Sequence, residues 1–464
     1  MRKFTQILTV VFLITTIFYA CTSNNPKDEK KDMKEPVKEK FSKFKVKHAD
    51  WVKTANIYEV NIRQYTPEGT FKAFEEHLPR LKEMGVEILW LMPIYPVGEK
   101  NRKGGMGSAY SVKDYVSVNP DYGTMDDFKD LVAKVHENGM HIILDWVANH
   151  TAWDHPWTQE HPEWYTKDST GNFMPPKGTD WSDVIDLNYD NLELRIEMIN
   201  SLKYWVQEAN IDGYRCDVAG MVPTDFWNTA RKELDAIKPV FMLAEAEQVD
   251  LHYKAFDMTY GWNFHHLMNE VAQGKKTVEA FDEYFKKDST VYPADAIRMY
   301  FTSNHDENTW NGTVFERMGD AYPAMAVLSF TIPGMPLIYS GQEAGLNKRL
   351  AFFEKDLIDW KGGKDLQAFY TQLIKLKKEH PALWNGAEGG SMQRIKSSSD
   401  DKIFAFIRKK GDDELIAVFN FSPETQKVKL NTESGKSFKD IFSGEEFNNE
   451  QELQAWEYRV YVNN

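Results

Sequence analysis

The sequence predicts a (β/α)8 (TIM) barrel with a short protrusion after its third strand and a small C-terminal β-sandwich domain. Strand-like and helix-like segments alternate over about three hundred residues, which favours a parallel barrel over an antiparallel sandwich. Apolar or β-prone segments at 213–217, 241–245 and 301–306 each end on an acidic side chain, as buried parallel strands do where they open into a site. After about Trp384 the pattern changes to short alternating strands separated by polar turns, which predicts the second domain.

Short apolar runs separated by polar or glycine-containing turns define the predicted barrel strands. In chain order, these runs are 56–62, 87–92, 140–147, 213–217, 241–245, 255–258, 297–302 and 336–339. Helical spacing predicts one helix over 71–84 that stops at Gly85. Thr124 with Asp127 resembles a capping box, and a further helix with one apolar face begins at Leu192.

One connection interrupts this alternation. Between the third strand and the helix at Leu192 lie about forty residues, 148–191, that are rich in Trp, His, Pro and Asp. A loop of this length in a compact domain is usually functional, so we expect a small protrusion over the site. The predicted domains are therefore a barrel over 48–384, which carries this insertion, and a β-domain over 385–464.

Residues 1–20 have the features of an export signal. A basic start precedes an apolar run over 7–20 that is too short for a comfortable membrane span. Cys21 follows, and the arrangement resembles a bacterial lipoprotein signal whose cysteine is lipidated; a plain secretory signal is the alternative. Residues 21–47 are charged and poor in large apolar side chains, which is typical of a flexible tether. We therefore expect an exported, membrane-anchored protein on the periplasmic or cell-surface face.

Composition narrows the classes of partner. The net charge of −14 disfavours nucleic acid, because phosphate binding requires a basic surface, whereas a neutral polymer meets no repulsion. The only cysteines are Cys21 and Cys216, so a disulfide framework is not expected. The chain contains 14 Trp and 21 Tyr, whose flat faces suit sugar platforms, although most such rings fill a core.

Three carboxylates at strand ends are the candidate reactive groups. Asp217, Glu245 and Asp306 each close an apolar run. Side chains at the C-terminal ends of different barrel strands converge on one pocket, so these three are expected to meet. Three carboxylates in one pocket can serve as a general acid, a nucleophile and a supporting group, and glycosidic bond cleavage requires such a set.

From about Trp51 to its C-terminus, the chain resembles the α-amylase family of glycoside hydrolases. The motifs that carry the resemblance are Asp145-Trp146-Val147-Ala148-Asn149-His150, Gly213 to Asp217, Ala244-Glu245, Asn304-His305-Asp306, Ala109-Tyr110 through Tyr122-Gly123-Thr124, and Gly334 to Glu343. Each motif alone has limited specificity, whereas six in family order and at family-like spacing are specific.

The resemblance implies retaining hydrolysis. Asp217 would attack the anomeric carbon, and Glu245 would protonate the leaving oxygen and later deprotonate water, with the two carboxyl groups about 5–5.5 Å apart. Negative charge nearby and the low polarity of a closed pocket should raise the pKa of Glu245. Asp306 would bind sugar hydroxyls and hold them more strongly as the ring flattens towards the transition state.

The resemblance also implies a set of substrate-binding residues around these acids. Arg215 lies two residues before Asp217, so it shares its strand face and should keep the nucleophile ionised. His150 and His305 should donate hydrogen bonds to the sugar, and Tyr110 should stack beneath it. The full set is Tyr110, Asp145, His150, Arg215 and His305.

The chain departs from the family pattern after the nucleophile. Many members carry a Lys-His pair there, used for calcium or for the leaving-side sugar, but Val218-Ala219-Gly220-Met221 follows Asp217 here. Asn149 stands where a calcium ligand is often found, yet a calcium site takes six to eight oxygens. We therefore expect that no cofactor is required. Calcium binding stays open, with Asn149 as its one candidate ligand.

Three functions stay open at this point. The first is a hydrolase of α-1,4 bonds in starch-like glucans or maltooligosaccharides. The second is a transglycosylase, an isomerase or an α-1,6-acting glucosidase on the same scaffold; Val218 is shared by some α-1,6-acting members. The third is a glycan-binding protein with an inactive barrel, which the loss of one acid would mark, and all three acids are present.

Overall fold

The computed structural model describes residues 46–361, 363, 365–432 and 436–463. The predicted signal peptide, Cys21 and all but the last two residues of the predicted tether lie outside these ranges. Within them, no helix combines the length and the apolar character needed to cross a membrane.

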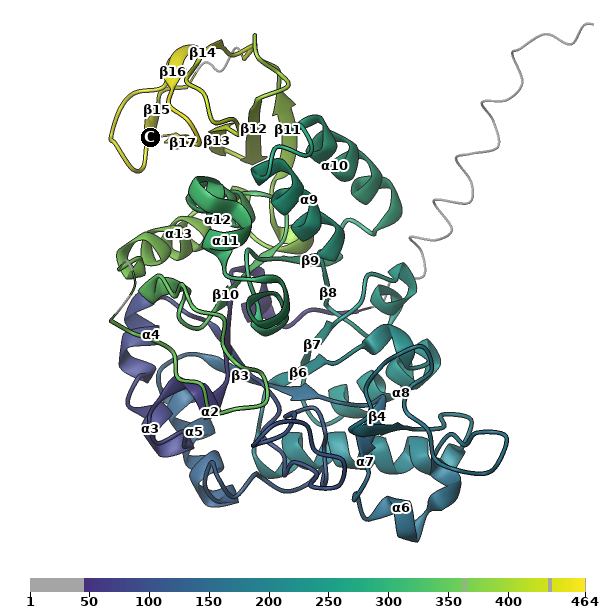
Figure 1. Ribbon diagram of the computed structural model, residues 1–464. Coiled ribbons are helices and arrows are strands. Elements are labelled where there is room, and N and C mark those ends of the chain that lie inside the picture. Colours follow the sequence, from purple (N-terminus) through teal and green to yellow (C-terminus); the bar gives the residue numbers. More distant parts are fainter. Residues whose placement is uncertain (1–45, 362, 364, 433–435, 464) are drawn as a thin grey trace, which may run out of the picture. The chain divides into compact units, whose positions relative to one another are not determined.

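Eight parallel strands close into a barrel, which confirms the predicted fold class (Figure 1). They are β1 (Ile57–Val60), β2 (Ile88–Leu91), β3 (His141–Trp146), β6 (Gly213–Cys216), β7 (Phe241–Ala244), β8 (Met258–Tyr260), β9 (Ile297–Tyr300) and β10 (Met335–Tyr339). Around the barrel they follow the order β1-β10-β9-β8-β7-β6-β3-β2, and each neighbouring pair is parallel. One strand was misplaced by the sequence pattern: Ala255 and Phe256 are buried before β8, which begins only at Met258.

Helices follow most of the barrel strands. The α-helices are α2 (Ile62–Tyr65), α3 (Phe71–Glu75), α4 (Leu78–Met84), α5 (Met125–Glu137), α6 (Trp157–Glu160), α7 (Leu192–Glu208), α8 (Thr224–Asp235), α9 (Trp262–Ala272), α10 (Glu279–Val291), α11 (Val314–Met318), α12 (Tyr322–Thr331) and α13 (Gln367–Glu379). The capping box of Thr124 and Asp127 is present at the start of α5. The single helix predicted over 71–84 is wrong, because the chain breaks at Glu76 and restarts as α4 with a proline in its first turn.

Alternate side chains of each barrel strand enter two different cores. Phe241 and Leu243 of β7 belong to the cluster that fills the barrel. Met242 and Ala244 belong to the cluster between strands and helices. Because side chains alternate with a period of two, the next residue, Glu245, faces the barrel axis at the C-terminal mouth.

Glycine is required where β6 meets β7. Gly213 has φ +150°, and a Cβ atom at this position would lie 1.8 Å from the carbonyl oxygen of Phe241. Close approach of the two strands at this point sets the register that carries Arg215 opposite Leu243.

The predicted insertion after β3 forms a small protrusion with its own hairpin. Strand β4 (His150–Ala152) pairs antiparallel with β5 (Val184–Asp186), so the start and the end of the insertion lie side by side. The short helix α6 and a 3-10 turn, η2 (Pro162–Trp164), lie between these strands in the chain. This pairing brings His150 close to the segment that ends the insertion.

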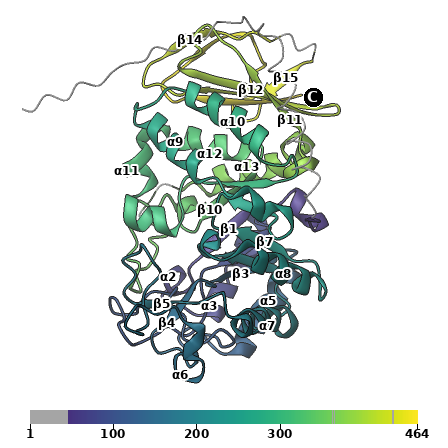
Figure 2. The ribbon, with the colours of Figure 1, turned by 90° about the vertical axis from the view of Figure 1, so that its right-hand side faces the viewer.

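The C-terminal residues form antiparallel sheets, as predicted (Figure 2). One sheet has the order β11 (Ser391–Ile395), β12 (Ile403–Lys410), β13 (Asp413–Asn420), β17 (Tyr458–Asn463) and β15 (Phe438–Asp440), and the other pairs β14 (Gln426–Lys429) with β16 (Glu450–Leu453). Val428 and Leu453 share a core with Ile403 of the larger sheet. The opposite face of that sheet packs on the barrel helices, for example Phe404 on Phe281 at 5.4 Å between ring centroids.

Candidate active site

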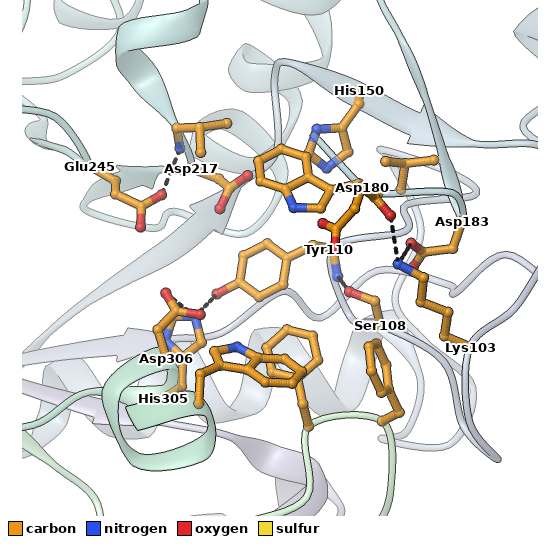
Figure 3. Close-up of a pocket in the computed structure, with 16 residues that line it drawn as sticks. Lys103, Ser108, Tyr110, His150, Asp180, Asp183, Asp217, Glu245, His305 and Asp306 are labelled. Carbon is orange, nitrogen blue, oxygen red and sulfur yellow. Dashed lines mark hydrogen bonds and ion pairs between the residues drawn. The ribbon is translucent and has the colours of Figure 1, made fainter. Parts of the chain in front are cut away.

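A pocket of about 410 Å³ opens at the C-terminal ends of the barrel strands (Figure 3). Its size is that of an ordinary small-molecule site. The residues that line it are Lys103, Ser108, Tyr110, His150, Asp180, Trp181, Asp183, Val184, Asp217, Val218, Glu245, His305, Asp306, Trp310, Phe352 and Phe353. Six of the eight predicted catalytic and substrate-binding residues are therefore brought together here, and the other two, Asp145 and Arg215, are fully buried.

The guanidinium of Arg215 holds three carboxylates at the floor of this pocket. Its Nη1 donates to Oδ1 of Asp217 and to Oδ1 of Asp145, each at 2.9 Å, and its Nη2 lies 2.9 Å from Oε1 of Glu245. The side chain has no exposed surface, and its Nε donates to the hydroxyl of Tyr260. Because a guanidinium stays charged even when buried, Arg215 fixes the orientation of Asp217 and Glu245 together.

Glu245 is held from its other side by the backbone. The amide N–H of Val218 donates to Oε2 of Glu245 at 2.8 Å. Val218 has φ 36° and ψ 43°, a left-handed conformation that β-branched residues rarely adopt, so the backbone is strained where this contact is made. Burial disfavours the charged form of Glu245 and raises its pKa to about 8. The negative charges of Asp217 and Asp306 act in the same direction, whereas the positive charge of Arg215 lowers the pKa.

A chain of hydrogen bonds links His305 to Asp145 through Tyr110. Nε2 of His305 lies 2.9 Å from the hydroxyl of Tyr110, which donates to Oδ2 of Asp145 at 2.9 Å. Nδ1 of His305 lies 2.5 Å from Oε1 of Glu59. Burial alone would lower the pKa of His305, but the carboxylates of Asp306 and Glu59 raise it to about 9. His305 is therefore a cation at neutral pH with both ring nitrogens donating.

Asp306 is the most exposed of the three candidate acids. A third of its side chain is accessible, and its Oδ2 lies 3.3 Å from Nε2 of His305. A π-helical turn, η5 (Glu307–Asn311), begins directly after it and carries Trp310 to the pocket wall. Such turns often occur at functional sites, and Asp306, directly before this one, lines the pocket where a ligand can reach it.

His150 and Asn149 differ in what they can contribute. His150 lines the pocket with its ring 5.4 Å from that of Trp181, and burial lowers its pKa, so the ring is neutral. Nδ2 of Asn149 lies 3.3 Å from Nδ1 of His150, and its backbone oxygen accepts from Leu187. In the part of the chain that the structure describes, no group of three His, Cys, Asp or Glu side chains could hold a metal ion. Calcium binding at Asn149 stays a prediction, because calcium also accepts amide and backbone oxygens as ligands.

Two kinds of site residue escaped the sequence analysis. Glu59 is an acid within an apolar strand run, so the signal that identified Asp217 could have identified it as well. Lys103, Asp183 and Phe352 lie in irregular loops, where no periodicity marks a side chain as pocket-facing. Cys216 is buried in the outer cluster and takes no part in the pocket, as its strand position predicts.

Comparison with known families adds an independent observation. The model of the alpha amylase catalytic domain matches residues 42–414. The chain belongs to the α-amylase family. A second model, that of the maltogenic amylase C-terminal domain, matches residues 393–460 of this α-amylase family glycoside hydrolase.

Individual members of the α-amylase family align over most of the chain. Alpha-amylase MalA of Haloarcula japonica is 26% identical over 412 residues, which cover 85% of this chain but only 59% of that relative. Alpha-amylase 3 of Dictyoglomus thermophilum is 28% identical, covering 82% of this chain and 88% of its own length. The crystal structure of the maltogenic alpha-amylase AmyB from Thermotoga neapolitana superimposes with a TM-score of 0.81 at 31% identity, covering 89% of this chain and 99% of AmyB.

Proposed function

We propose that this protein hydrolyses α-1,4-glucosidic bonds of starch-like glucans or maltooligosaccharides with retention of configuration. Asp217 is the nucleophile that forms the glycosyl-enzyme ester, and Glu245 is the general acid and then the general base. The observation that supports the proposal most directly is that the guanidinium of Arg215 contacts both Asp217 and Glu245, at 2.9 Å each. One charged group thereby positions both carboxylates on the same pocket floor.

The two carboxylates have environments that suit different roles. Glu245 is protonated at neutral pH because its pKa is raised to about 8, so it can give a proton to the leaving oxygen. Asp217 accepts a charge-assisted hydrogen bond from Arg215, which orients a carboxylate oxygen for attack. This division between two neighbouring acids is the pattern expected of a retaining glycosidase.

The remaining polar groups suit a neutral, hydroxyl-rich ligand. His305 lines the pocket as a cation, Asp306 offers acceptor oxygens, and Tyr110 presents a ring stacked on that of His305 with 5.4 Å between the ring centroids. Aromatic faces combined with a few fixed donors and acceptors bind sugars, which carry both apolar faces and hydroxyls. The names of the relatives, α-amylases and a maltogenic amylase, support an α-glucan as the substrate.

Digestion of maltoheptaose by the purified protein tests the substrate and the reaction together. The products are followed by chromatography, with the Asp217→Asn variant as the blank. We expect only maltooligosaccharides shorter than the substrate. Products longer than maltoheptaose would assign a transglycosylase, because a sugar hydroxyl would then resolve the intermediate. If nothing exceeds the blank while an α-1,6-linked oligosaccharide is cut, the linkage in our proposal is wrong.

We also infer that the protein is exported and held at a membrane through lipidated Cys21. A basic start, an apolar run over 7–20 and a charged segment over 21–47 support this. We expect the full-length protein in the membrane fraction of the cells that produce it and a Cys21→Ala variant in the soluble fraction. Equal partitioning of the two proteins would contradict the anchor.

A further inference from the structure

The two sides of the pocket differ in which part of a glucan they can receive. A second pocket of about 530 Å³ adjoins the first, and Val218 and Glu245 line both. Because the acid must face the leaving oxygen, the departing, reducing-side part of the chain extends past Glu245 into this second pocket. The non-reducing part must therefore lie on the opposite side, towards Lys103 (Figure 3).

A charged pair stands at that opposite side. Nζ of Lys103, in the loop after β2, lies 3.1 Å from Oδ1 of Asp183, in the insertion after β3, and donates to the backbone oxygen of Asp180 at 3.3 Å. The Asp183 side chain is 7% exposed and that of Lys103 is 33% exposed, and both line the pocket. The pair thus bridges two loops across the end of the pocket and faces its interior (Figure 3).

The loop after β10 contacts the loop that carries Lys103, and its Phe352 and Phe353 line the pocket. The amide of Gly105 donates to Oε1 of Glu354 at 2.6 Å, and the amide of Met106 donates to the backbone oxygen of Phe353 at 2.9 Å. The contact leaves no room for a side chain at Gly104, where a Cβ atom would lie 2.4 Å from Cβ of Phe353. The loop after β2 is therefore joined both to the insertion and to the loop after β10 at this end of the pocket.

We propose that Lys103 and Asp183 bind the non-reducing terminal sugar, so that the enzyme attacks glucan chains from that end. This inference rests on the proposed function. A terminal sugar has a free 4-hydroxyl that can accept from Lys103 and donate to Asp183, which keeps both charged groups hydrogen-bonded. In a chain that continues, this oxygen is a glycosidic ether that cannot donate, and the next sugar must separate an ion pair that joins two loops.

Paired maltoheptaosides test this, one with a free non-reducing end and one whose terminal 4- and 6-hydroxyls are blocked as an acetal. We expect the wild-type protein to cut the free substrate at least about tenfold faster, the size of a lost hydrogen bond to a charged group. Asp183→Asn and Lys103→Met should bring this ratio towards one. Lys103 is partly exposed, so Lys103→Met should fold even if Asp183→Asn, at a buried position, does not.

Lys113→Met is the matched control. Lys113 pairs with Glu99 and with Asp154 of the insertion, at 3.2 and 3.3 Å, but does not line the pocket, so its loss should leave the ratio unchanged. Equal cutting of free and blocked substrate by the wild-type protein overturns the end-binding role while the hydrolytic function stands. A high ratio that survives in both pocket variants also overturns it, and failure to cut either substrate overturns both proposals.

Discussion

The Asp217→Asn variant is expected to lose glucan hydrolysis by about four orders of magnitude or more in kcat, as enzymes do when a covalent nucleophile is removed. The fold should survive, because asparagine is nearly isosteric and its side-chain oxygen can still accept from Nη1 of Arg215. Initial rates on maltoheptaose, together with the thermal unfolding midpoint, check both parts of this expectation.

The neighbouring residue provides the control for this variant. Cys216 precedes Asp217 but points to the outer core, so Cys216→Ala should retain kcat and lose only packing energy. If Asp217→Asn turned over at the wild-type rate, the nucleophile would have to be another carboxylate. If it unfolded, loss of activity would say nothing about chemistry, which is why the unfolding midpoint is measured alongside.

The Glu245→Gln variant is expected to lose about 10²- to 10⁴-fold on glucans, the usual contribution of a general acid. An activated substrate such as α-maltosyl fluoride should be affected far less in the step that forms the ester, because fluoride leaves without a proton. The comparison of single-turnover rates on the two substrates therefore separates loss of acid catalysis from loss of the site.

The pH profile of the same variant gives a second readout. Glu245 must be protonated to act as the acid, and its pKa is raised to about 8, so kcat/KM of the wild-type protein should fall as pH rises through about 8. In Glu245→Gln this basic limb should be absent. Glu247→Gln is the matched control, because Glu247 is held by Arg298 at 2.8 Å and should leave the limb in place. If kcat/KM of Glu245→Gln still fell at basic pH, the general acid would have to be another residue.

Local pattern was enough to predict the carboxylates, since their position depends on two regular features. Side chains alternate along each strand, and parallel strands of a barrel end at the same mouth. The contact of Arg215 with Asp217 follows from a separation of two residues on one strand. Its contacts with Asp145 and Glu245 depend on strands β3 and β7, whose register with β6 the pattern does not specify.

The loop residues that form the walls of the pocket could not be predicted from local sequence pattern. The Lys103–Asp183 pair and the contact between Gly105 and Glu354 join loops that are distant in the chain and have no repeating spacing. The break between α3 and α4 was missed for a related reason: the apolar spacing continues through Glu76, and only the proline at the start of α4 indicates a new helix. The specificity that we propose for this protein therefore rests on the elements that the sequence pattern constrains least.

Trapping of the covalent intermediate tests the central claim most directly. A 5-fluoro α-maltosyl fluoride forms the glycosyl-enzyme ester through its good leaving group, and the second fluorine slows release, so the ester accumulates. Peptide mass spectrometry should locate a single 5-fluoromaltosyl adduct on Asp217, absent from the Asp217→Asn variant. An adduct on any other residue, or the same adduct in the Asp217→Asn variant, would contradict the assignment of Asp217 as the nucleophile.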